Sequence, residues 1–438
     1  MKPINVGLLG IGTVGGGTFN VLARNREEIS RRAGREIRIS MVADKDVERA
    51  RKIVGDAAMV VADGRAVVES PDIDIVIELI GGYTVAKDFV LRAIANGKHV
   101  VTANKAMLAT HGNEIFAAAQ AKGVIVAFEA AVCGGIPIIK ALREGLTANR
   151  IEWIAGIVNG TSNFILTEMR DKGLAFDTVL KEAQARGYAE ADPTFDIEGV
   201  DAAHKTTILS ALAFGTPMQF TKAYTEGITK LTQDDIKYAE QLGYRIKLLG
   251  ITKRTPEGIE LRVHPTLIPT RRLIANVEGV MNAVLVKGDA VGQTMYYGAG
   301  AGAEPTASAV VADLVDVART LTTDPGNRVP HLAFQADQLA SVAILPMEQV
   351  ITSYYLRMRV LDRPGALADI TRILADRSIS IGAMIQREPG EGEDQVDIIM
   401  LTHQTREKNV NEAMTKIEAL PVVTGKVTRI RLEELAAR

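Results

Sequence analysis

The sequence predicts an α/β protein of three units, and three observations support this prediction. The N-terminal third alternates short apolar runs with helical patterns, which is typical of an open parallel sheet covered by helices. The middle of the chain mixes strands of polar alternation with helices, which indicates an α+β unit. From Tyr354 onward the order is βαββαβ, the ferredoxin-like arrangement. A length of 438 residues also fits about three domains of roughly 150 residues each.

The first unit is expected to occupy residues 1–140 and to include a returning helix at about residues 305–325. Its first strand, Ile4–Leu9, is a continuous apolar run that ends at Gly10, as a buried parallel strand does. The other predicted strands are Ile37–Ala43, Ile73–Ile80, His99–Thr102 and Val124–Phe128, and the predicted helices are Thr18–Arg32, Val47–Val54, Val85–Ala95 and Thr306–Thr320.

The second unit is expected at residues 141–304, and residues 326–350 are read as a connector. The third unit is expected at residues 351–432, with residues 433–438 as a fraying tail. In the second unit we expect strands at Ile151–Val158, Glu260–Leu267 and Ala283–Lys287 and helices at Val179–Ala185 and Ala202–Phe214. In the third we expect strands at Leu356–Leu361, Ile379–Gln386, Val396–His403 and Lys426–Leu432 and helices at Ala366–Arg377 and Val410–Glu418.

A glycine-rich turn joins the first strand to the first helix. Gly10, Gly12 and Gly15 form G-x-G-x-x-G, with Thr13 and Val14 inside the motif. The three glycines would permit a tight turn, close approach of a pyrophosphate and close packing of helix on strand. Because the motif opens a βαβ unit, it indicates a Rossmann-type dinucleotide-binding domain more than a mere bend.

The choice between NAD and NADP depends on the end of the second strand. Asp44 would bind the ribose hydroxyls of NAD and repel the 2′-phosphate of NADP. Lys45, the next residue, would tolerate that phosphate, so the sequence leaves both cofactors open.

Composition excludes several classes of function. Lys and Arg total 51 against 53 Asp and Glu, and this near-neutral balance is a poor match for a nucleic-acid surface. One cysteine, Cys133, allows neither an intrachain disulfide nor a cysteine-based metal cluster. The N-terminus lacks signal-peptide features, and no apolar stretch reaches the roughly 18 residues of a membrane span. We expect a cytoplasmic protein with no membrane partner.

Carboxylates gather in the middle of the chain, between two predicted helices. Pro193 and Gly199 interrupt helical structure, so Glu190, Asp192 and Asp196 are expected to lie on a loop.

Asp201 and Lys205 follow this loop, four residues apart at the start of the next helix and therefore on one helix face. That helix is otherwise strongly apolar, which suggests a polar site; a surface ion pair with a helix cap at Asp201 is an equally good reading.

The run from Ala183 to Lys205, A-x3-G-Y-A-x2-D-P-x2-D-I-x-G-x-D-x3-K, resembles the signature of homoserine dehydrogenases. Three further segments are similar to that family: Thr102–Lys105, Asn159–Asn163 and Gly298–Glu304. The resemblance spans about residues 1–330. The C-terminal unit resembles an ACT domain, with Asp362, Pro364, Gly365 and Leu367 in the pattern of its ligand loop.

The resemblance implies NAD(P)H-dependent reduction of aspartate 4-semialdehyde to homoserine, a step that serves threonine, methionine and isoleucine synthesis. Hydride delivery to an aldehyde builds negative charge on its oxygen, which a nearby cation stabilises and protonates. The family match makes Lys205 the general acid/base, with Lys105 assisting polarisation and Asp201 holding Lys205. It also implies that Glu190 binds the substrate ammonium group. It assigns Gly160, Thr161, Tyr188, Glu190, Asp196, Asp201 and Lys205 to substrate binding and Ala103, Lys105 and Gly302, beside the glycine turn, Asp44 and Lys45, to the cofactor.

Glu129, Val132, Gly134 and Ile136 match the family's monovalent-cation loop, where a carboxylate and backbone carbonyls would suit sodium. An ordinary strand-to-helix turn is the competing reading. For the ACT unit, the resemblance implies threonine as a feedback inhibitor, and the alternative is a unit that only dimerises. A homodimer through the substrate domain, or a homotetramer through ACT pairing, is implied in the same way.

Two other functions remain open on the sequence. An enzyme like aspartate-semialdehyde dehydrogenase would need Cys133 as a nucleophile, and no nearby motif supplies it with a histidine. A non-catalytic nucleotide-binding amino-acid sensor would have lost its catalytic residues, whereas Lys105, Glu190, Asp201 and Lys205 are all present.

Overall fold

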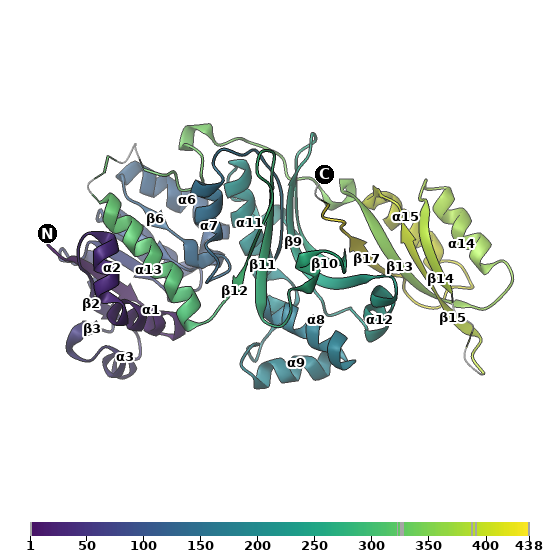
Figure 1. The fold of residues 1–438 in the computed structure, drawn as a ribbon, viewed down its shortest axis with the longest axis horizontal. Helices are drawn as coiled ribbons and strands as arrows, with labels where there is room; N and C mark the ends of the chain where they lie inside the picture. The colour runs from purple at the N-terminus through teal and green to yellow at the C-terminus, as the bar shows by residue number, and fades with distance from the viewer. Residues whose placement is uncertain (1, 322, 325–327, 387–388, 390–391, 437–438) are drawn as a thin grey trace.

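The computed structural model describes residues 2–321, 323–324, 328–386, 389, 392–436 of the chain. It confirms the predicted fold class, because a parallel sheet, a mixed sheet and a βαββαβ unit follow one another along the chain (Figure 1). Residues 326 and 327, at the start of the expected connector, lie outside the described residues. None of the described helices combines the length and the apolar character that crossing a membrane requires.

The first sheet has six parallel strands in the order β3-β2-β1-β4-β5-β6. Helix α13 comes from far along the chain, yet it packs beside α1 and α2 in the core of this sheet (Figure 1). The strands are β1 (Ile4–Leu9), β2 (Ile37–Ala43), β3 (Met59–Val61), β4 (Ile75–Glu78), β5 (His99–Thr102) and β6 (Val126–Ala127); the helices are α1 (Thr13–Arg24), α2 (Arg26–Ala33), α3 (Val47–Val54), α4 (Arg65–Glu69), α5 (Thr84–Ala95), α6 (Lys105–Lys122) and α13 (Ala303–Thr320).

The first helix differs from the prediction of one helix at Thr18–Arg32. It begins five residues earlier, at Thr13 inside the glycine-rich turn, and it ends at Arg24, so that α2 is separate. Within this added first part, Gly17 lies against α13, where an added Cβ would meet the Ala303 carbonyl oxygen at 2.6 Å. The prediction also omitted β3 and α6.

The second unit contributes strands and helices around a mixed sheet. After α7 (Ile138–Lys140), at the end of the first unit, its elements are β7 (Ile151–Ile157), α8 (Gly160–Lys172), α9 (Phe176–Ala185), α10 (Thr194–Ile197), α11 (Val200–Phe214), β8 (Tyr224–Thr225), α12 (Gln233–Gln241), β9 (Tyr244–Arg254), β10 (Ile259–Pro269), β11 (Met281–Gly288) and β12 (Gly292–Ala299). Asp196, which was expected on a loop, lies in the single-turn helix α10 after Pro193, a residue that favours a helix start.

The C-terminal unit is joined to the second unit by one continuous sheet. Its elements are β13 (Ile351–Leu361), α14 (Ala366–Ala375), β14 (Ile381–Gln386), β15 (Gln395–Thr402), β16 (Thr405–Arg406), α15 (Glu407–Glu418) and β17 (Thr428–Leu432). Strand β17 pairs in parallel with β10 through Thr266–Arg431 and Leu267–Leu432, which makes an eleven-stranded sheet.

The expected fraying tail is wrong for its first residues. Glu433 accepts a hydrogen bond from Arg262 at 2.6 Å, and its amide donates to the Leu267 carbonyl at 3.0 Å. Leu435 is buried against the central sheet. The residues after β17 therefore anchor the C-terminal unit on the second unit.

Candidate active site

A cavity of about 690 Å³ lies at the carboxyl ends of β1 and β4. The strand order reverses between these two strands, and ligands of open α/β sheets bind at such a reversal. Gly10, Gly12, Asp44, Lys45 and Tyr83 are among the lining residues. Four of these were predicted for the cofactor, and the structure brings them to one cavity.

The glycine-rich turn has the shape that a dinucleotide needs. Gly10 has a φ of +88°, which only glycine adopts readily. Gly15 lies so close to the turn that an added Cβ would meet the Gly10 carbonyl oxygen at 2.1 Å, whereas at Gly12 it would meet nothing within 4 Å. Gly12 thus leaves open space beside the start of α1, at Thr13 and Val14, and these residues fit a bound pyrophosphate.

Asp44 already has partners in the protein. Its Oδ2 accepts a hydrogen bond from the Ile11 amide at 2.8 Å, and its Oδ1 accepts from the Asp46 amide at 2.9 Å. The carboxylate therefore ties the end of β2 to the glycine-rich turn, and it still borders the cavity with Lys45.

The segment after β5 carries the first lysine. Asn104 caps α6, because its Oδ1 accepts from the Met107 amide at 3.0 Å, and its Nδ2 donates to the Gly82 carbonyl beside the cavity at 2.8 Å. Ala103 precedes this cap, and Lys105 is the first residue of the helix. Gly302 begins α13 with a φ of +124°.

Asp201 lies between two lysines from distant parts of the chain. Its Oδ2 is 2.7 Å from Nζ of Lys205, and its Oδ1 is 3.1 Å from Nζ of Lys105. Lys205 also donates to the Val158 carbonyl at 2.7 Å. Asp201 and Lys205 are buried and Lys105 is partly exposed, so this is an interior polar site and not a surface ion pair.

Burial and charge act against each other in this group. Burial alone would raise the pKa of Asp201, but Lys205 and Lys105 outweigh it and hold that pKa well below its usual range. Burial alone would lower the pKa of Lys205, yet the Asp201 carboxylate prevails and raises it. Lys205 is thus held as an ammonium group that can donate a proton to an oxygen.

Asn159 is a site residue that sequence reasoning did not single out. Its Nδ2 donates to Asp196 at 2.7 Å and to Asp201 at 2.9 Å, while its Oδ1 caps α8 by accepting from the Ser162 amide at 2.8 Å. It lies in the family-like segment Asn159–Asn163, and its other sequence signal is an asparagine before the glycine that starts a helix, a common capping pattern. Burial, followed by the charge of Asp201, raises the pKa of Asp196.

The other predicted substrate residues border this group. Gly160 and Thr161 form the first turn of α8, and the Thr161 hydroxyl donates to the Tyr188 carbonyl at 2.6 Å. Tyr188 and Glu190 are exposed on the segment before α10, and the Glu190 carbonyl accepts from Gln184 at 3.1 Å. The Glu190 carboxylate is thus not joined to the Asp201 group by any hydrogen bond found among the described residues.

In the loop after β6, where the cation site was predicted, backbone amides hold the carboxylate of Glu129. The two carboxylate oxygens of Glu129 accept from the amides of Ile139 and Lys140 at 2.9 and 2.8 Å, so this side chain caps α7. The Glu129 and Ile136 carbonyls each accept one backbone hydrogen bond, which leaves each a second lone pair, so they stay candidate ligands beside the carbonyls of Val132 and Gly134. Within the described ranges, no three His, Cys, Asp or Glu side chains form a group that could hold a metal ion.

Cys133, in the same loop, lacks the features of a nucleophile. It is buried, its pKa is raised to about 11 chiefly by burial, and its nearest polar partner is Nδ2 of Asn282 at 3.6 Å. This environment disfavours the mechanism of an aspartate-semialdehyde dehydrogenase.

The four predicted ligand-loop residues of the C-terminal unit lie between β13 and α14. Asp362, Pro364 and Gly365 are exposed, Leu367 is half-buried, and Gly365 turns the chain with a φ of +90°. The loop is therefore open to solvent and precedes a helix N-terminus.

A nucleotide-binding sheet whose cavity opens near a buried lysine–carboxylate group defines a dinucleotide-dependent oxidoreductase. Residues 10–129 match the NAD-binding domain of homoserine dehydrogenase, residues 137–315 match the homoserine dehydrogenase domain, and residues 354–422 match the ACT domain.

The chain belongs to the homoserine dehydrogenase family. It is 62% identical to the homoserine dehydrogenase of Pseudomonas aeruginosa over 99% of this chain and 100% of that one. The crystal structure of a homoserine dehydrogenase from Thiobacillus denitrificans has a TM-score of 0.96 at 72% identity, covering 100% of this chain and 99% of that chain. A hyperthermophilic archaeal homoserine dehydrogenase in complex with NADPH has a TM-score of 0.63 at 26% identity, covering 73% and 98%.

Proposed function

We propose that this protein catalyses the reversible reduction of L-aspartate 4-semialdehyde to L-homoserine with NADH or NADPH. The observation that supports the proposal most is that Asp201 holds both Lys105 and Lys205 beside the first turn of α8. The bound dinucleotide would supply the hydride to the aldehyde carbon. Glycine-rich turn residues, Asp44, Lys45, Ala103 and Gly302 would hold that cofactor.

The chain's own residues would manage the charge on the aldehyde oxygen. Lys205, kept protonated by Asp201, donates a proton to this oxygen, and Lys105 polarises it before transfer. In the opposite direction the neutral Lys205 amine removes the hydroxyl proton of homoserine. Glu190 binds the substrate ammonium group, and Gly160, Thr161, Tyr188 and Asp196 supply further polar contacts.

Absorbance of the reduced nicotinamide tests this proposal directly. Purified protein with homoserine and NADP should produce NADPH, and the same assay with NAD decides the cofactor preference. An amino-acid sensor without catalysis would give no signal with either cofactor.

We also propose that threonine, the end product of the pathway, inhibits the enzyme through the ACT loop Asp362–Leu367. Deleting the unit is a poor test, because β17 pairs with β10 and its loss would expose that edge. Asp362→Asn should instead weaken inhibition by threonine, while Asp376→Asn, at the exposed end of α14, should leave it unchanged. Equal sensitivity of both variants and the wild type would argue for a unit that only dimerises.

We also propose the domain limits, the assembly and the cation binding that the sequence predicted. The first sheet and the return of α13 support a unit at residues 1–140 with about 305–325, and a separate hydrophobic core supports a unit at 351–432, which leaves 141–304 as the second unit and 326–350 as the connector. A homodimer or homotetramer, and sodium bound at Glu129, Val132, Gly134 and Ile136, follow from family membership alone.

A further inference from the structure

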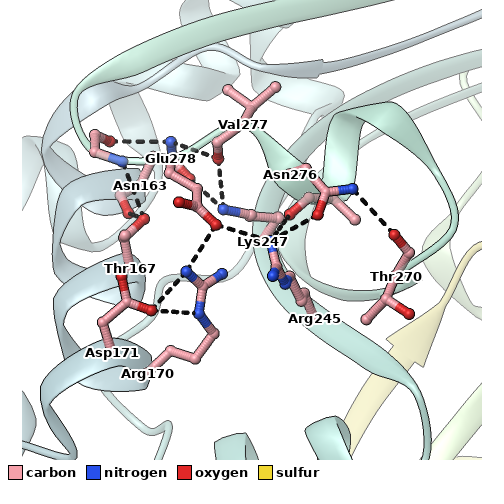
Figure 2. A network of polar contacts seen from close by, with 12 residues as sticks. Asn163, Thr167, Arg170, Asp171, Arg245, Lys247, Thr270, Asn276, Val277 and Glu278 are labelled. Atoms are coloured by element: carbon pink, nitrogen blue, oxygen red, sulfur yellow. Dashed lines mark hydrogen bonds and ion pairs between the residues drawn. The ribbon is translucent and has the colours of Figure 1, made fainter.

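Another buried lysine, Lys247, lies near the candidate active site, against the Asn159–Asn163 segment. Lys247 is on β9, its side chain is 1% exposed, and Figure 2 shows it pointing toward α8 and the loop before β11. Its Nζ donates to Oδ1 of Asn163 at 3.0 Å and to the Val277 carbonyl at 2.6 Å. Both partners are uncharged oxygens. Burial lowers the pKa of Lys247 to about 7, which favours the neutral amine in this position.

Asn163 also binds the rest of the loop 277–281. Its Nδ2 lies 3.1, 3.0 and 3.1 Å from the carbonyl oxygens of Val277, Gly279 and Met281, in the fan of contacts that Figure 2 shows beside Lys247. The Thr167 hydroxyl accepts from the Gly279 amide at 3.2 Å. The loop 277–281 is thus fastened to the first two turns of α8.

The N-terminal end of the same helix turn belongs to the active site. Gly160 fits beneath the loop so closely that an added Cβ would meet the Val280 carbonyl oxygen at 2.6 Å. Asn159, one residue earlier, bridges Asp196 and Asp201. The start of α8 is therefore held at two points one turn apart: at Asn159 by Asp196 and Asp201, and at Asn163 by Lys247 and the loop 277–281.

We propose that Lys247, acting through Asn163, is a positioning residue that sets the first turn of α8 for substrate binding. It touches no reacting atom, and its effect reaches the substrate through Gly160, Thr161 and Asn159. This inference rests on the proposed function, because the substrate it concerns is homoserine or its aldehyde.

Lys247→Met tests the proposal, because methionine fills the same buried space and donates no hydrogen bond. The KM for homoserine should rise about tenfold, while the KM for the dinucleotide should stay within about twofold. Lys253→Met, on the same strand but partly exposed, is the matched control and should change neither constant. Loss of a merely structural residue would lower thermal stability without separating the two constants.

Thr167→Val keeps the argument testable if Lys247→Met does not fold. This isosteric change removes one loop contact and should raise the homoserine KM about two- to threefold, again without changing the dinucleotide KM. Folded variants with wild-type constants, or with both constants raised alike, overturn the inference. If the wild type itself does not oxidise homoserine, the proposed function fails and the inference with it; normal wild-type turnover beside an unchanged Lys247→Met overturns the inference alone.

Discussion

Nη1 of Arg431 lies 2.8 Å from Oε2 of Glu226, and this ion pair joins the ACT unit to the catalytic part of the chain. Arg431 is 1% exposed and also donates to Glu407 at 3.0 Å and to the Tyr224 hydroxyl at 3.0 Å. Two residues after Glu226, the Ile228 amide donates to the Ile197 carbonyl at 2.8 Å, directly beside Asp196. A movement of β17 therefore has a short physical route to the active site.

Glu226→Gln should weaken this junction without stopping catalysis. Neutralising the partner of a buried guanidinium costs on the order of 1–3 kcal/mol, so the melting temperature should fall by several degrees while basal turnover persists. Sensitivity to threonine should decrease if the junction carries the regulatory signal. Thermal unfolding measures the melting temperature, and titration of the enzyme assay with threonine measures the sensitivity to inhibition. Glu393→Gln, which removes an exposed pair with Arg359, is the control; equal effects of the two variants would contradict the buried-junction argument.

Local elements of the fold were predictable, because they depend on short-range patterns. The strand at Ile37–Ala43 and the helix at Val47–Val54 have the predicted bounds, since apolar runs and helical periodicity are properties of neighbouring residues. The pairing of β17 with β10 was not predicted. It involves two residue pairs more than 160 positions apart, and no local pattern marks which strands will share an edge.

In the candidate site, too, short-range relationships could be predicted from the sequence and long-range contacts could not. Asp201 and Lys205 follow from helical spacing, whereas Lys105, about a hundred residues earlier, was joined to them only by family resemblance. Asn159 was marked only as part of the family-like segment Asn159–Asn163, and Lys247 carries no sequence signal of its own. One resembles an ordinary helix cap, and the other is a lysine in a strand whose burial depends on contacts from α8 and the loop 277–281.

Lys205→Ala should reduce turnover by several orders of magnitude, because the proton donor to the aldehyde oxygen is lost. Dinucleotide affinity should change little, since the cavity lined by Gly10 and Gly12 contains no part of Lys205. Stopped assays give turnover, and quenching of NADPH fluorescence gives affinity. Lys222→Ala, an exposed lysine on the same unit, should match the wild type. Turnover near that of the wild type in Lys205→Ala would remove Lys205 from the mechanism.

Asp201→Asn should shift the pH profile in a defined direction. In the wild type the Asp201 carboxylate outweighs burial and raises the pKa of Lys205. The amide removes that charge and leaves the burial, so the pKa of Lys205 falls. Reduction requires the protonated lysine, and its alkaline limit should therefore move to lower pH. Rates of aldehyde reduction across the alkaline range measure this shift. Asp192→Asn, whose carboxylate bonds only to Thr194 among the described residues, should leave the profile in place.

Glu129 should make the folded protein less stable as the pH rises from about 5 to about 8. Burial, assisted by the charge of Asp313, raises its pKa from the ordinary 4.5 to about 7. Between these values the folded protein binds more protons than the unfolded chain, so the free energy of unfolding decreases with rising pH.

Glu129→Gln removes this titration, and its melting temperature should decrease less across the same range. Part of the decrease should remain at the acidic end, because the pKa of Asp313 is itself raised to about 6, again chiefly by burial. Between the wild type and Glu129→Gln, the change in unfolding free energy across this pH range should differ by about 1–3 kcal/mol. Glu152→Gln, on the exposed side of β7, controls for the loss of one negative charge. Parallel curves for Glu129→Gln and the wild type would show that Glu129 is ionised in the folded protein throughout, with Lys140 and the α7 amides stabilising its charge against burial.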